Sequence, residues 1–114
     1  MFEASNGDLY LVSFIKSLAI LSPQKKLLAV YTNSDLMVGM AEDAHGVVVS
    51  VAGELYRVGT NYFQPYAYTN GAKPQMYWIL NLATGRGGVI WVASAGGIFR
   101  VKDGACQQLS LIHI

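Results

Sequence analysis

Residues 88–101 read GVIWVASAGGIFRV, and the fold that the sequence predicts depends on this stretch. It contains two short runs of β-branched, aromatic and small residues, Val89–Ala93 and Gly97–Val101, which are bounded by glycines. Short runs of this composition between glycines are typical of β-strands. The stretch therefore predicts two consecutive strands.

A related pattern occurs twice more along the chain. A glycine followed by an apolar run stands at Gly7, Gly46 and Gly88, at intervals of 39 and 42 residues. A second apolar run follows in each unit, over Leu18–Leu21, Leu55–Val58 and Ile98–Val101. A period near 40 residues with about four short strands is typical of a β-propeller blade.

The predicted fold is all-β, an open arc of about three four-stranded blades from a β-propeller, because a closed ring usually takes four to eight blades. The repeat units extend approximately over residues 1–41, 42–83 and 84–108. Further strands are predicted over Leu9–Val12, Lys26–Tyr31, Val47–Val51 and Glu54–Val58. Tight turns are predicted at Asn6-Gly7, Asn70-Gly71 and Asp103-Gly104, because these residue types accept positive φ angles.

One segment leaves two alternatives open. Residues Ser34–Asp43 have apolar residues at helical spacing, but the same segment also fits a strand over Leu36–Ala41. Gly39 lies in the middle and favours the strand, because glycine weakens a helix interior.

The composition excludes several classes of protein. Charged residues make up 13% of the chain and apolar residues 53%, which argues against intrinsic disorder. The net charge is +1 and the basic residues are scattered, so no basic face for nucleic acid is expected. Two histidines and the lone Cys106 cannot supply a four-ligand zinc site or an internal disulfide. The apolar stretch Leu9–Leu21 is too short and too polar to span a membrane, and we expect no cofactor.

The low charge fits blades whose apolar faces pack against neighbouring blades. Three blades leave such faces uncovered, so we expect the isolated chain to be poorly soluble or to self-associate. A separate feature is the C-terminal sequence LSLIHI, residues 109–114, which resembles the in-frame translation of a transposase sequencing adapter. We exclude these residues from the predicted blades. The alternative is a genuine strand, since apolar residues there interleave with Ser110 and His113.

The repeat pattern resembles the two-component regulator propeller repeat. Residues 88–101 carry Trp91, Ser94 and the closing Gly97-Ile98-Phe99-Arg100 of that family's pattern. The second unit has the opening Asp43-Ala44-His45-Gly46 and the closing Leu55-Tyr56-Arg57, with Val49 in place of the tryptophan. In the first unit Tyr10 takes the tryptophan position and no arginine follows, while the third unit has Gly85-Arg86-Gly87-Gly88 instead of the acidic opening. Tyr62–Tyr66 and Met76–Leu80 resemble the usual third and fourth strands of a blade in that family.

The resemblance implies a segment of an extracytoplasmic, periplasmic sensor region of a hybrid histidine kinase or related regulator. Such regions typically detect oligosaccharides and pass the signal across a membrane to a kinase. The implied partners are the remaining blades of the parent propeller and an oligosaccharide ligand, and the parent is expected to be homodimeric. Because the segment itself contains no kinase or phosphoacceptor motif, we expect it to have no enzyme activity.

The residues with a structural role in the repeat are Gly7, Gly46, Gly88, Trp91, Gly97, Arg57 and Arg100. Trp91 is interpreted as a wedge between blades. Arg57 and Arg100 are interpreted as strand-end side chains that extend to solvent or pair with a neighbouring acid.

Six aromatic residues gather within residues 62–78. Aromatic faces stack on sugar rings and tyrosine hydroxyls add hydrogen bonds, so Tyr66, Tyr68 and Trp78 are the candidate ligand residues. The alternative is a purely structural role, because aromatic residues are also favoured in strands. We predict that Tyr68→Ala weakens oligosaccharide binding.

No residue pattern indicates catalysis. Glu42 and Asp43 are adjacent, so in a strand they point to opposite faces, and we interpret them as an exposed turn between blades. His45 and Cys106 have no partner nearby in the sequence that would support covalent catalysis. Residues 84–88, TGRGG, resemble a phosphate-binding loop but precede a strand, so we interpret them as an inter-blade turn.

Two other functions remain as alternatives. A propeller-fold carbohydrate-active enzyme requires convergent carboxylates or His and Tyr from several blades, and no repeated polar position suits that role. A protein-interaction propeller of the WD or kelch type carries Trp-Asp or Gly-Gly signatures, which are missing at their proper places here.

Overall fold

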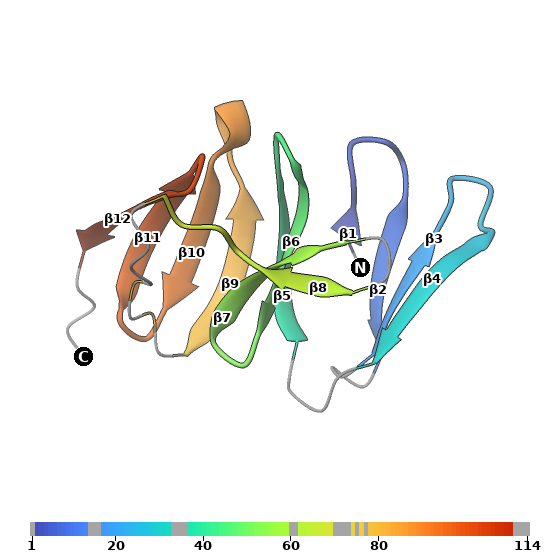
Figure 1. Cartoon of the computed structure of the whole chain (residues 1–114), viewed down its shortest axis with the longest axis horizontal. Coiled ribbons are helices and arrows are strands. Elements are labelled where there is room, and N and C mark those ends of the chain that lie inside the picture. The colour runs from blue at the N-terminus through green and yellow to red at the C-terminus, as the bar shows by residue number, and fades with distance from the viewer. Residues whose placement is uncertain are drawn as a thin grey trace.

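The chain forms three antiparallel four-stranded sheets that stand side by side (Figure 1). We number them in chain order as sheets 1, 2 and 3, and sheet 2 lies in the middle. This computed structural model describes residues 2–13, 17–32, 37–59, 62–69, 74, 76 and 78–110. Over these residues the structure confirms the all-β prediction and an open arc of four-stranded sheets.

Each sheet is built from consecutive strands. Sheet 1 contains β1 (Phe2–Glu3), β2 (Leu9–Ser13), β3 (Ser17–Leu21) and β4 (Leu27–Thr32). Sheet 2 contains β5 (Met37–Asp43), β6 (Gly46–Val51), β7 (Glu54–Val58) and β8 (Phe63–Pro65). Sheet 3 contains β9 (Ile79–Thr84), β10 (Ile90–Ser94), β11 (Gly97–Lys102) and β12 (Ala105–Ser110).

The segment with two alternatives is a strand. β5 occupies Met37–Asp43, so the helix alternative is wrong over these residues, and Leu36 lies outside the described residues. The strand expected over Met76–Leu80 as a late strand of a blade is instead β9, which begins at Ile79 and is the first strand of sheet 3. The turn predicted at Asn70-Gly71 lies outside the described residues, as does Tyr77.

The positions of β5 and β9 correct two predictions about turns between blades. Residues 84–88 connect β9 to β10, and Glu42-Asp43 end β5 before β6, so both segments lie within a sheet rather than between sheets. The sheets occupy residues 2–32, 37–65 and 79–110, and the repeat units are therefore offset from them by about one strand. β12 includes Leu109 and Ser110 of the suspected tail, whose origin stays a prediction.

The repeated motif forms the second and third strands of every sheet. Counted from the connecting turn, the equivalent cross-strand pairs are Tyr10↔Ile20, Val48↔Arg57 and Trp91↔Arg100. The residue of sheet 2 at the position of Trp91 is therefore Val48 and not Val49. Counting from the glycine before the strand gives Val49, which is one residue too far. The turn fixes the register of the hairpin, so positions are equivalent when they are counted from the turn.

Two hydrophobic clusters fill the seams between the sheets. The seam between sheets 1 and 2 buries Leu18, Ile20, Tyr31, Met37, Val49 and Val51. The seam between sheets 2 and 3 buries Ala41, Val48, Leu55, Tyr66, Met76, Ile79, Leu82, Ile90, Val92, Phe99 and Val101. In β6 every residue from Val47 to Val51 is buried, because sheet 2 is covered on both faces.

The first strands of sheets 2 and 3 lie against each other, and Gly39 permits the approach. A Cβ atom at Gly39 would lie 2.9 Å from the backbone nitrogen of Leu82. Polar bonds cross the same region, since Ser5 donates to the Glu42 carboxylate and the Glu42 N–H donates to Thr84 Oγ1. One polar path therefore links all three sheets.

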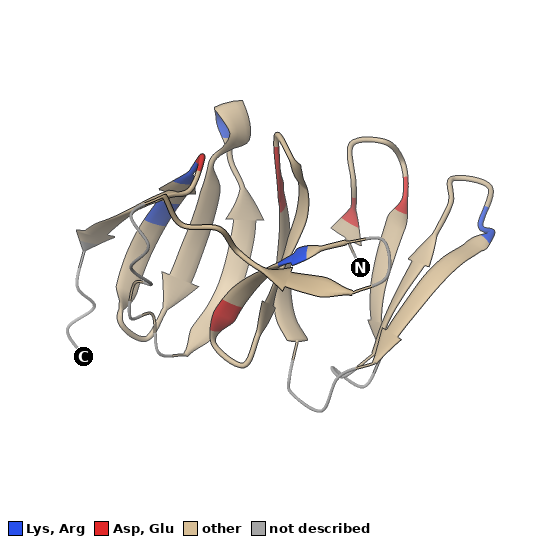
Figure 2. Cartoon of the chain, in the orientation of Figure 1, with Lys and Arg blue, Asp and Glu red and all other residues tan. Residues whose placement is uncertain are grey.

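Charged residues lie mostly at turns and strand ends, as Figure 2 shows, and the hydrophobic residues that fill the seams between sheets include none of them. Within the part of the chain that the structure describes, no helix has the length and apolar character that crossing a membrane would require.

Candidate ligand site

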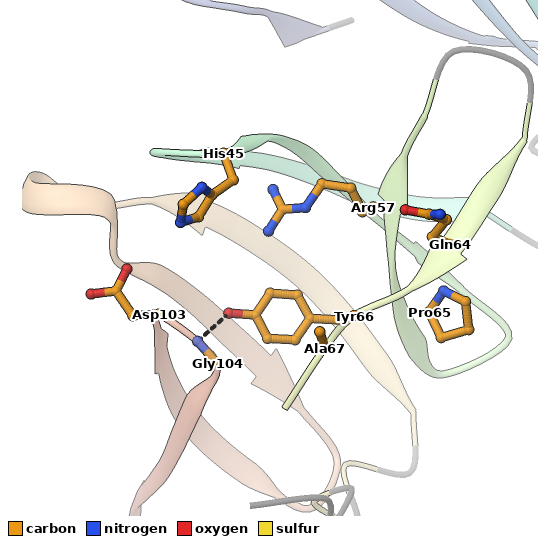
Figure 3. A pocket seen from close by; sticks show the side chains of 8 residues that line it. All are labelled: His45, Arg57, Gln64, Pro65, Tyr66, Ala67, Asp103 and Gly104. Carbon is orange, nitrogen blue, oxygen red and sulfur yellow. Dashed lines mark hydrogen bonds between the residues drawn. The ribbon is translucent and has the colours of Figure 1, made fainter. Parts of the chain in front are cut away.

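A pocket of about 350 Å³ opens where sheet 2 meets sheet 3 (Figure 3). Its residues come from the β5–β6 turn, from β7, from β8 and the segment after it, and from the β11–β12 turn. They are His45, Arg57, Gln64, Pro65, Tyr66, Ala67, Asp103 and Gly104. The volume is within the range of small-molecule sites.

The charged centre of the site is the ion pair between Arg57 and Asp43. Arg57 donates from Nη1 to Asp43 Oδ1 at 2.6 Å and from Nη2 to Oδ2 at 2.8 Å. Nη1 also donates to the Gly46 carbonyl at 3.1 Å. The Asp43 side chain is 4% exposed and that of Arg57 21%. Of the two alternatives for Arg57, the structure selects pairing with a neighbouring acid.

Two opposing effects set the pKa of Asp43. Burial raises it, but the hydrogen bonds from the Arg57 guanidinium and from the His45 backbone N–H, together with the Arg57 charge, lower it by more. The net result is a pKa below the ordinary value, so Asp43 is ionised at neutral pH. The pair therefore contributes almost no net charge to the pocket.

Tyr66 forms the wall of the pocket that connects the two sheets. Its hydroxyl accepts a hydrogen bond from the Gly104 N–H at 2.9 Å, and the Arg57 guanidinium carbon lies 5.6 Å from the centre of its ring. The Thr69 N–H donates to the Gly104 carbonyl at 3.0 Å. Residues 66–69 thus fasten the end of sheet 2 to the β11–β12 turn of sheet 3.

Gly104 is required by this attachment. Its φ is +85°, and a Cβ atom there would lie 2.6 Å from Thr69 Cγ2 and 2.9 Å from the Ala67 carbonyl oxygen. A side chain would therefore force residues 66–69 away from the turn.

The three aromatic candidates occupy different environments. Tyr66 lines the pocket, whereas Tyr68 packs behind it, with ring centres 4.9 Å apart, and contacts the hydrophobic cluster between sheets 2 and 3. Burial raises the pKa of Tyr68 far above its ordinary value. Trp78 precedes β9, is 72% exposed and does not line this pocket.

The repeat glycines Gly7, Gly46, Gly88 and Gly97 all have positive φ angles. Trp91 and Arg100 are paired across β10 and β11 on the outer face of sheet 3. Trp91 is 37% exposed, and a Cβ at Gly85 would lie 2.6 Å from its indole nitrogen. In sheet 3, Gly85 lies opposite Val89 and occupies the position that Asp43 has in sheet 2. Arg100 therefore has no acid where Arg57 has Asp43.

Sequence reasoning missed most of the pocket. His45, Gln64, Asp103 and Gly104 were not candidates, although His45 and Asp103-Gly104 belong to turns that the sequence marks clearly. The described residues hold no cluster of three His, Cys, Asp or Glu that could bind a metal ion. A search of protein-family models and of curated proteins found no match to the chain.

Proposed function

We propose that this chain is a segment of an extracytoplasmic sensor propeller that binds a neutral, hydroxyl-rich ligand of the oligosaccharide class and relays binding to a two-component kinase or regulator. The observation that carries the ligand part is the pocket at the junction of sheets 2 and 3. The relay part follows the resemblance of the repeat.

The chemistry of the pocket favours a neutral polar ligand. The Arg57 charge is matched by Asp43, so the site holds no unpaired buried cation that would select an anion. The Gln64 amide, the His45 imidazole and the Asp103 carboxylate offer both donors and acceptors. Sugar hydroxyl groups require this combination of donors and acceptors.

The position of the pocket supports a signalling role. Residues of both sheets line it, and the hydrogen bond that the Gly104 N–H donates to the Tyr66 hydroxyl joins its two sides. A ligand seated here would contact sheet 2 and sheet 3 together and so favour one relative placement of the two.

The same geometry disfavours the enzyme alternative. Glycoside hydrolysis usually needs two carboxyl groups that face the substrate. Of the two aspartates nearest the pocket, Asp43 is held by Arg57, which leaves Asp103.

The proposal is tested by titrating the full chain calorimetrically with neutral hexose and pentose oligosaccharides and with an acidic oligogalacturonide. We expect a neutral oligosaccharide to bind, and Gln64→Ala to weaken its binding at least five-fold. Gln24→Ala is the matched control, because Gln24 is exposed in the turn between β3 and β4, outside the pocket. Gln64 is a better probe than Tyr68, whose ring also supports the core.

Failure of every oligosaccharide to bind would contradict the ligand class. Equal losses in Gln64→Ala and Gln24→Ala would contradict the pocket as the binding site. A far-ultraviolet circular dichroism spectrum identical to that of the unchanged chain shows that each variant is folded.

A further inference from the structure

The arc ends in two uncovered apolar faces, one on sheet 1 and one on sheet 3. We call the side of a sheet that is turned toward the following sheet its forward face, and the opposite side its rear face. Tyr10 packs on the seam between sheets 1 and 2, and Val48 packs on the seam between sheets 2 and 3. Trp91 is equivalent to both by hairpin register, so it lies on the forward face of sheet 3.

The rear faces follow from the neighbouring positions. Val49 packs toward sheet 1 and Val92 toward sheet 2, and the equivalent residue of sheet 1 is Leu11. Leu11 pairs with Ala19, which in turn pairs with Val30 on β4, and directly paired residues share a face. Val30 therefore lies on the rear face of sheet 1.

Exposure shows that these two faces lack a cover in the single chain. Val48 is fully buried, whereas Trp91 at the equivalent position is 37% exposed. On the other end, Val30 and Leu27 are each 57% exposed. Both faces combine several apolar side chains, which a soluble molecule rarely leaves uncovered as a continuous patch.

Both internal seams join a forward face to a rear face, and the chain carries one spare face of each kind. We propose that a second copy of this chain docks head to tail, with the forward face of sheet 3 of one copy on the rear face of sheet 1 of the other. The contact continues the established seam. Two such contacts in a pair of copies make six sheets, which is within the four to eight blades of closed propellers. This inference rests on the seams and not on the proposed sensor function.

The mass of the chain in solution is the first test. Sedimentation velocity across a concentration series is expected to show a species of twice the 12.4 kDa of the chain. In a Trp78→Phe variant, Trp91 is the single remaining tryptophan, and its emission should shift to shorter wavelength as the dimer forms. A monomer at all concentrations with exposed Trp91 would overturn the proposal and indicate that another partner covers the faces.

Charged variants then distinguish head-to-tail contact from other modes. Trp91→Glu blocks the forward face and Val30→Glu the rear face, so each variant alone should be monomeric. A mixture of the two retains one intact face of each kind and should form a one-to-one complex. Tyr62→Glu is the control. Tyr62 is 59% exposed, but it directly precedes β8 of sheet 2 and so belongs to neither end sheet.

Four results would overturn the proposal. Dimers of Trp91→Glu alone would mean that rear faces pair with each other, and dimers of Val30→Glu alone would mean that forward faces do. Failure of the mixture to associate would exclude the seam itself, and open polymers of the unchanged chain would exclude closure by two copies. If a variant loses its strand spectrum, Ile98→Glu and Leu27→Glu repeat the test on the same two faces.

Discussion

Removing either partner of the Arg57–Asp43 pair should destabilise the chain, but by unequal amounts. In Arg57→Met the Asp43 carboxylate, which is 4% exposed in the unchanged chain, loses the guanidinium and keeps the hydrogen bond from the His45 N–H. An uncompensated buried charge of this kind costs about 3–5 kcal/mol. Asp43→Asn leaves Arg57 21% exposed and still bonded to the Gly46 carbonyl, so we expect a loss of about 1.5–3 kcal/mol.

The difference between the variants should depend on pH in a defined direction. In the unchanged chain the pKa of Asp43 is lowered, so its contribution to stability is present above 3.8, the ordinary value, and is lost as the pH falls through the folded-state pKa. Without the Arg57 guanidinium in Arg57→Met, we expect burial to outweigh the hydrogen bond from His45 and to raise the pKa of Asp43. The penalty of that variant should therefore be largest at neutral pH and shrink as the pH falls toward 3.8, because the neutral acid needs no cation.

Urea unfolding followed by circular dichroism at one fixed protein concentration measures these free energies. The double variant with both substitutions should be more stable than Arg57→Met alone, because a neutral amide replaces the buried carboxylate. Equal losses in the two single variants, or a penalty for Arg57→Met that stays constant between pH 7 and pH 4, would refute the reasoning.

Three further results are expected. In the same urea assay Gly104→Ala should lower the free energy of unfolding by about 1–3 kcal/mol more than Gly46→Ala. Both glycines have positive φ, but a Cβ meets Thr69 and Ala67 only at Gly104, so equal losses would contradict the close approach. Tyr66→Phe should cost about 1–3 kcal/mol, because it leaves the Gly104 N–H without its acceptor, whereas the exposed Tyr62→Phe should be nearly neutral; a neutral Tyr66→Phe would exclude that bond. Burial raises the pKa of Cys106, so a thiol reagent at pH 8 should react with the folded chain at least ten-fold more slowly than with the urea-unfolded chain, and similar rates would contradict the packing of Cys106.

The sequence was sufficient for the parts of the fold that depend on local pattern. The hairpins formed by β6 with β7 and by β10 with β11 follow from alternating apolar runs around two-residue turns. The first strands were harder, because β1 has two residues and β5 contains Gly39, so neither has a strong pattern of its own. β5 forms where it does because it fits against β9, which is a contact between distant parts of the chain.

The candidate site could be predicted only in part for the same reason. Asp43 and Arg57 both belong to the repeated motif, and the register of β5, β6 and β7 would have indicated their pairing once the strands were known. The approach of Tyr66 to Gly104 is different, because it depends on how residues 66–69 cross from sheet 2 to sheet 3. No local pattern encodes that crossing. In the sequence, Tyr66 is therefore a candidate only because it is aromatic.

The low charge of the chain gains a specific cause from the equivalence of Val48 and Trp91. Val48, which sheet 3 follows, is fully buried, whereas Trp91, which no sheet of this chain follows, is 37% exposed. Both residues are apolar, so the sequence of sheet 3 is suited to a covered face. The same holds for Val30 on sheet 1. A charged share of 13% is therefore low for three sheets that end in water, and it suits sheets that each contact a neighbour on both sides.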